Sequence, residues 1–67
     1  MGWINKNDNI PEHEPELGRT RYVLVTDGEE IGIGCYYYEY KYWVYSFAGF
    51  NETSDNKIIK WMELPKI

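Results

Sequence analysis

The chain has 67 residues, of which 18% are aromatic, and a net charge of −4. A chain this short buries only about 60% of the surface that its unfolded form exposes, so we expect residues 1–67 to form a single small domain of modest stability. Cys35 is the one cysteine, which excludes an intrachain disulfide, and together with the lone His13 it falls short of a four-ligand zinc site. Homo-oligomerisation or dense aromatic packing remains as the source of additional stability.

The charge balance bears on the partners that the protein can have. Eleven acidic side chains against seven basic ones disfavour direct nucleic-acid binding, because that affinity comes mainly from lysine and arginine at phosphates. No apolar run approaches the roughly 18 residues of a membrane-spanning helix. The N-terminal residues also lack the basic and apolar regions of a signal peptide. We therefore expect a cytoplasmic protein without membrane contact.

The first twenty residues favour irregular structure. They contain Pro11, Pro15, Gly18 and a polar run over 5–9, which oppose a regular helix or strand. We predict an ordered lead-in that apolar side chains anchor to the core. These anchors are Trp3, Ile4 and Ile10.

A β-hairpin is predicted next. Residues 22–26 are β-branched and aromatic, and they end at Asp27-Gly28, a dipeptide typical of a tight turn. The second strand is predicted to start at Glu30 and to run to Tyr38, where glycines 32 and 34 should leave room for an aromatic ring from a neighbouring strand or for a flat ligand. Period-two alternation predicts a core face on this strand. Its residues are Ile31, Ile33, Cys35 and Tyr37.

Two further strands complete the predicted fold. The pattern indicates a third strand over 42–47, an exposed loop over 48–56 and a last strand over 57–62. Short turns join these strands, and no helical crossover is predicted between them. We therefore predict a mainly β protein, a small four-stranded antiparallel meander sheet with an irregular N-terminal lead-in.

Four segments of the chain together resemble a known family. They are Gly2-Trp3-Ile4, Ile10-Pro11-Glu12, the strand and turn over 23–28, and the ending over 59–65. This ordered set is similar to the domain-of-unknown-function family 551, short proteins of bacteriophages and prophages. Lys60 and Glu63 stand where that family usually has histidine and proline, so no role of that histidine is carried over. The resemblance implies a compact phage-encoded accessory protein.

Candidate catalytic groups are sparse. His13 lies in a loop rich in glutamate and proline without a nearby serine or cysteine, and Cys35 lies in the strand register predicted to face the core. The acidic pair over 29–30 falls in a turn, where like charges stay solvated. We expect a protein that binds rather than catalyses, with no metal and no cofactor.

Aromatic side chains cover both faces of the strands over 31–38 and 42–47. One interpretation is a two-sided core or a homodimer interface. The other is a ligand platform on which rings stack, with Arg19, Arg21 or Lys41 holding a phosphate. The ligand residues predicted on this second interpretation are Arg19, Arg21, Tyr36, Tyr38, Tyr40, Trp43 and Tyr45.

The resemblance to phage accessory proteins implies a role against host defence. We predict a homo-oligomer that sequesters a small nucleotide immune signal in an aromatic pocket at or near the subunit interface. A first alternative is a protein that binds a host defence factor through its acidic and aromatic surface. A second is a structural or assembly protein. The sequence leaves all three open.

Overall fold

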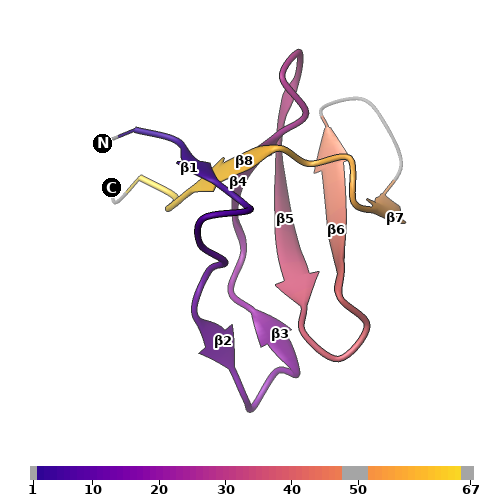
Figure 1. Cartoon of the computed structure of the whole chain (residues 1–67). Helices are drawn as coiled ribbons and strands as arrows, with labels where there is room; N and C mark the ends of the chain where they lie inside the picture. The colour runs from indigo at the N-terminus through magenta and orange to yellow at the C-terminus, as the bar shows by residue number, and fades with distance from the viewer. Residues whose placement is uncertain (1, 48–51, 66–67) are drawn as a thin grey trace.

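The regular structure of the protein is entirely β. The computed structural model describes residues 2–47 and 52–65, and these residues contain no helix. They form a six-stranded antiparallel sheet with the order β1-β8-β4-β5-β6-β7 and a separate hairpin of β2 and β3 (Figure 1). The strands are β1 Ile4–Asn5, β2 His13–Glu14, β3 Arg19–Thr20, β4 Val23–Thr26, β5 Ile31–Tyr37, β6 Tyr42–Phe47, β7 Thr53–Asp55 and β8 Lys60–Met62.

The described residues include no helix that is long and apolar enough to span a membrane.

The predicted turn between β4 and β5 is confirmed. Gly28 takes a positive φ of 101°, which glycine adopts without steric cost. The Asp27 carboxylate accepts hydrogen bonds from the backbone N–H groups of Glu29 and Glu30, both at 2.9 Å. The Thr26 hydroxyl accepts from the Gly28 N–H at 3.0 Å and donates to the Glu30 carbonyl at 2.7 Å. Side chains therefore satisfy the turn's backbone groups, and the same bonds from Glu30 and Glu29 lower the pKa of Asp27.

The glycines of β5 lie on its core face. Gly34 is paired with Tyr45 and Gly32 with Phe47. A Cβ on Gly34 would lie 2.6 Å from Tyr45 Cβ, and one on Gly32 would lie 2.6 Å from Phe47 Cδ1. The two positions thus accommodate aromatic residues of β6, which confirms the packing interpretation of these glycines.

The predicted core face of β5 is wrong. Ile31 and Ile33 are 59% and 49% exposed, Tyr37 is half-buried, and of this set Cys35 is buried. The physical reason lies in β6, because its inward rings fill the space that the glycines leave. The apolar isoleucines consequently point outward.

The core lies between the inner face of the sheet and the segments that cross it. Its buried members are Val23, Val25, Trp43, Tyr45, Ile58 and Trp61. The predicted anchors Ile4 and Ile10 pack against this cluster, whereas Trp3 is half-buried outside it. The Trp61 indole N–H donates to the Asn9 carbonyl at 2.9 Å, which fixes the lead-in to the last strand.

The topology differs from the predicted four-stranded meander. Strands β4 to β7 do form a meander, but β7 lies in the segment predicted as a loop, of which residues 48–51 are outside the described residues. The last strand begins at Lys60 rather than at Lys57, and it pairs with β4 and β1. The connection from β7 therefore runs from one edge of the sheet back to β8 (Figure 1), and it brings Ile58 into the core.

The lead-in also contributes regular structure, in β1 and in the β2–β3 hairpin. Thr20 of the hairpin is fully buried, and its hydroxyl accepts a hydrogen bond from the Tyr36 N–H at 2.9 Å and donates to the Arg21 carbonyl at 2.9 Å. Pairing of β4 with β5 reaches only to Gly34. The threonine hydroxyl therefore takes the place of a strand partner beyond the end of β4.

Candidate functional site

The structure does not bring the seven predicted ligand residues to one surface. Trp43 and Tyr45 are buried in the core, so neither presents a ring face to solvent. The Tyr45 hydroxyl donates to Asp55 Oδ1 at 2.6 Å. Burial, with the hydrogen bond to the Asp55 carboxylate, raises the pKa of Tyr45 to about 12. Tyr45 therefore has a structural role, whereas Trp43 is a core residue that also lines part of a pocket.

Tyr38 attaches the lead-in to the end of β5. Its hydroxyl donates to the Pro11 carbonyl, and its ring lies 4.5 Å from the His13 ring and 5.2 Å from the Tyr36 ring, between centroids. Burial is the main cause that raises the pKa of this tyrosine. The Tyr38 ring thus packs against other rings of the protein, which leaves less of its surface for stacking on a ligand.

Tyr40 lies apart from the other predicted residues. It is 62% exposed in the turn between β5 and β6. Its ring centroid is 5.8 Å from that of Tyr42 and 6.4 Å from that of Tyr37. We call these three residues the tyrosine cluster.

The two arginines are engaged within and beside the β2–β3 hairpin. The Arg19 guanidinium lies 4.5 Å above the Tyr22 ring and donates to the Thr20 carbonyl at 2.8 Å. Arg21 lies 3.7 Å from a Glu12 carboxylate oxygen and 3.9 Å from a Glu14 oxygen. The carboxylates beside Arg21 reduce its attraction for a phosphate.

A different group of residues forms the candidate ligand site. A pocket of about 220 Å³ includes two of the predicted residues, Tyr36 and Trp43, with Lys41, the lysine predicted as a phosphate partner. We call it the lysine pocket. It is lined by Lys6, Asn7, Ile10, Tyr36, Lys41, Trp43 and Asn56.

Three segments far apart in the sequence meet at the lysine pocket. Lys6 Nζ donates to the Asn56 carbonyl at 2.6 Å, and Asn56 Nδ2 donates to the Lys41 carbonyl at 3.3 Å. Lys41 has a φ of 58° and its N–H donates to the Tyr37 carbonyl at 2.7 Å. The turn between β5 and β6, the segment after β1 and the connection after β7 are thereby held together. An ammonium has three donors, so Lys6 retains hydrogen-bonding capacity for a ligand.

The electrostatics of the lysine pocket favour an anion. Its lining residues include two lysines and no aspartate or glutamate. Within the described residues, the ion pairs are both made by Arg21. Lys6 does contribute to lowering the pKa of Asp55, although less than the hydrogen bonds from the Tyr45 hydroxyl and the Lys57 N–H. The pocket is therefore a local basic site on an acidic protein.

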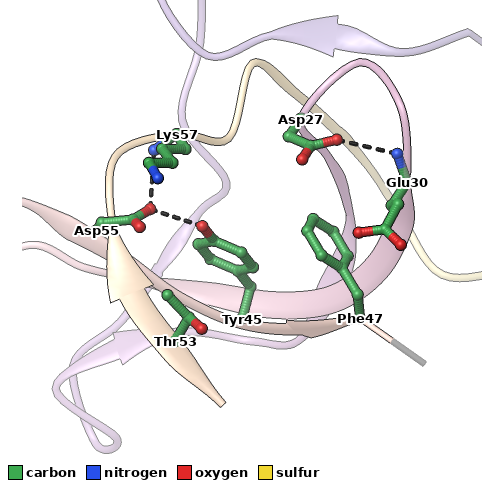
Figure 2. Close-up of a pocket in the computed structure, with 7 residues that line it drawn as sticks. All are labelled: Asp27, Glu30, Tyr45, Phe47, Thr53, Asp55 and Lys57. Carbon is green, nitrogen blue, oxygen red and sulfur yellow. Dashed lines mark hydrogen bonds between the residues drawn. The ribbon is translucent and has the colours of Figure 1, made fainter. Parts of the chain in front are cut away.

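A second pocket has the opposite character. It has a volume of about 270 Å³. In Figure 2 the Tyr45 and Phe47 rings lie between Asp55 on one side and Asp27 and Glu30 on the other. Asp55 accepts from the Tyr45 hydroxyl and from the Lys57 N–H. No group of metal-ligating side chains suited to a cation occurs in the described residues. The lining is Asp27, Glu30, Tyr45, Phe47, Thr53, Asp55 and Lys57.

Neither residue considered for catalysis is placed in the lysine pocket. His13 packs on Tyr38. Cys35 is buried, as expected of a small apolar side chain, and this burial raises the pKa of its thiol.

The chain matches no protein-family model, no curated protein and no solved structure. The similarity to family 551 stays a prediction that depends on the four sequence segments.

Proposed function

We propose that the protein is a non-catalytic binding protein that holds a small phosphorylated ligand of nucleotide type in the lysine pocket. The observation that carries this proposal is the placement of Lys6 and Lys41 around one pocket beside the half-buried Tyr36, with no carboxylate in the lining. On the resemblance to phage accessory proteins, the ligand is a nucleotide signal of host immunity, and binding sequesters it in the cytoplasm.

The chemistry of the lining supports such a ligand. Lysine ammonium groups bind phosphate through charge-assisted hydrogen bonds. The side chains of Asn7 and Asn56 carry both donors and acceptors for ribose or base atoms. Tyrosine rings provide stacking surface that tolerates any base. The predicted phosphate partners Arg19 and Arg21 are replaced in this proposal by Lys6 and Lys41.

The size of the pocket limits what it encloses. Pockets that enclose drug-sized ligands measure about 300–1,000 Å³, whereas the lysine pocket measures about 220 Å³. We therefore expect the phosphate-bearing part of the ligand to be enclosed and the remainder to lie at the mouth.

Calorimetric titration tests the proposal. The probes are 3′,5′-cyclic AMP, cyclic di-GMP, ADP-ribose and inorganic phosphate, added to the wild-type protein and to the double variant Lys6→Gln/Lys41→Gln. We expect at least one nucleotide to bind and the double variant to bind it at least tenfold more weakly, which corresponds to about 1.4 kcal/mol. Lys57→Gln is the matched control, because Lys57 lines the acidic pocket instead. Equal binding by the double variant, or no binding of any probe, would overturn the proposal.

The tyrosine cluster supports a second candidate, binding of a host defence protein. Tyr40 is largely exposed, and tyrosines are enriched among residues that anchor interfaces. The acidic part of that alternative is weaker, because Glu12 and Glu14 lie beside Arg21. Crosslinking in bacterial lysate, with Tyr40→Ala against Leu17→Ala as control, tests it. A partner lost in the first variant and kept in the second would support this candidate, and a partner retained by both would contradict it.

A further inference from the structure

The outer face of the main sheet is apolar and lies opposite the core. One row of paired residues runs across four strands through Met62, Leu24, Ile33 and Ser46. The flanking rows add Ile31, which pairs with Thr26, and Val44, which pairs with Cys35. Ile31 and Ile33 are about half exposed or more, so this surface has large apolar side chains in water.

We infer that this outer face packs against the same face of a second copy of the chain, with the two sheets facing each other in a symmetric homodimer. In such an arrangement each copy contributes the same patch. Packed sheets lie about 10 Å apart with their strands within about 30° of each other, which lets the isoleucines of both copies interdigitate.

Charge favours a second copy as the occupant. The protein carries a net charge of −4, so two copies repel each other unless their carboxylates stay apart. In the rows described above and in the adjoining pair of Thr26 with Lys60, Lys60 is the one charged residue, and Arg19 and Glu52 act electrostatically on Cys35 at one end of the face. Besides Glu52, several carboxylates lie in the turn over 27–30 and in the β2–β3 hairpin, outside these rows. The outer face therefore lets identical acidic molecules approach, and it offers little to a partner that is recognised by charge.

The area of the face sets the expected strength. The seven residues of β5 span about 23 Å, and four strands span about 15–19 Å, which gives a flat footprint of roughly 400 Å². A standard stable interface buries about 800 Å² of accessible surface per partner, about one sixth of the 4915 Å² of this chain. Protruding side chains make the accessible area larger than the footprint. We expect a dimer at the lower end of stable interfaces, with a Kd in the micromolar range.

The inferred dimer places the lysine pocket away from the subunit contact. Tyr36 and Trp43 of that pocket are paired on the inner side of β5 and β6, whereas Ile33 and Val44 point outward. The sequence predicted a pocket at or near the interface, and this arrangement instead gives two separate pockets per dimer. The inference does not rest on the proposed ligand.

Sedimentation equilibrium in the absence of nucleotide tests the dimer. With a chain mass of 8.0 kDa, we expect the wild-type mass to rise toward twice that value as concentration increases from about 5 to 500 µM. Ile33→Lys and Ile31→Lys place a buried charge in the contact and should weaken association at least thirtyfold. Leu17→Lys is the control, because Leu17 is 53% exposed in the β2–β3 turn.

Near-UV circular dichroism of the buried Trp43 verifies that each variant is folded. Because Ile31 and Ile33 are 59% and 49% exposed, we expect the monomer to fold with lysine at either position. A folded monomeric variant beside a dimeric control therefore supports the inference. A wild type that stays monomeric over the whole range, or lysine variants that associate like the wild type, would overturn it. Because no nucleotide is present, this result is independent of ligand binding.

Discussion

The two faces of β5 have opposite compositions and opposite environments. The inner face has Gly32 and Gly34 yet belongs to the core, whereas Ile31 and Ile33 on the outer face are exposed. The difference follows from β6, whose Tyr45 and Phe47 cover the glycines. Burial of a strand face is therefore decided by what its neighbours place over it, and the size of its own side chains is secondary.

The largest effect is expected from filling the inner face. Gly34→Val places a side chain where Tyr45 Cβ and the Val44 carbonyl leave no space, and both contacts involve groups attached directly to the backbone. We expect a loss of about 3 kcal/mol or more in the free energy of unfolding, at the upper end of overpacking costs. Urea unfolding followed by tryptophan fluorescence measures it. Ile33→Val on the outer face is the control and should cost about 0.5 kcal/mol or less in the monomer; similar losses at both positions would contradict the comparison.

The next effect concerns Thr20, the inward residue of β3. Thr20→Val keeps the shape and removes the acceptor of the Tyr36 N–H. A buried donor without a partner costs about 1–3 kcal/mol, so we expect a loss in that range by thermal or urea unfolding. Thr53→Val, on the exposed edge strand β7, should have little effect. A neutral Thr20→Val would show that the hairpin does not depend on this bond.

Tyr45→Phe tests the link between the inner face and β7. Losing the hydrogen bond to the Asp55 carboxylate should cost about 1.5–3 kcal/mol at pH 7. The bond lowers the pKa of Asp55, so its stabilisation is present above the ordinary carboxyl value of 3.8 and is lost as pH falls below it. The raised pKa of Tyr45 makes wild-type stability decline as pH rises from 10 toward about 12.

Unfolding free energies of the wild type and the Tyr45→Phe variant across pH check these signs. The difference between them should shrink in acid, and it should also shrink above pH 10. A difference that is constant from acid to pH 12 would show that the hydroxyl contributes through packing alone.

The smallest effect is expected at Arg21, which lies on the exposed side of the hairpin. Its distances to Glu12 and Glu14 are 3.7 and 3.9 Å, and its side chain is about half exposed. Exposed pairs of this kind contribute about 0–1 kcal/mol, so Arg21→Gln should change the unfolding free energy by less than about 0.5 kcal/mol. The unfolding free energies of the wild type and the variant are measured at low and at high salt. A difference that disappears at high salt is due to the charges of the ion pairs. A loss comparable to that of Thr20→Val would mean that the ion pairs hold the hairpin.

Local sequence patterns correctly predicted those elements that are determined by neighbouring residues in the sequence. The turn at Asp27-Gly28 and the strand over 42–47 follow from turn chemistry and side-chain alternation, and both are present. Alternation divides β5 into two faces without showing which is buried, because that depends on Tyr45 and Phe47, eleven to fifteen positions later. The pairing of β8 with β4 was missed because a meander assumes that strands adjacent in sequence are adjacent in space.

The candidate site was predicted in part. Tyr36, Trp43 and Lys41 were singled out by the density of rings around the turn between β5 and β6. Lys6 and Asn56 are fifty positions apart and come from segments predicted as irregular, so no local signal joins them. The rule that aromatic strands offer rings to a ligand also failed for Tyr45, because in so short a chain the same rings have to form the core.

The pairing of β1 with β8 makes the two ends of the described chain one cooperative unit. In the main sheet β1 has β8 as its neighbour, and the bonds from the Lys6 N–H to the Ile59 carbonyl and from Trp61 to Asn9 extend that contact. Fraying of β8 removes the strand partner of β1, and with it Lys6 leaves the lysine pocket. A bound phosphate would therefore slow amide hydrogen exchange in β1 and β8. Ligand binding would thus be measurable as stronger hydrogen-exchange protection of the two terminal strands.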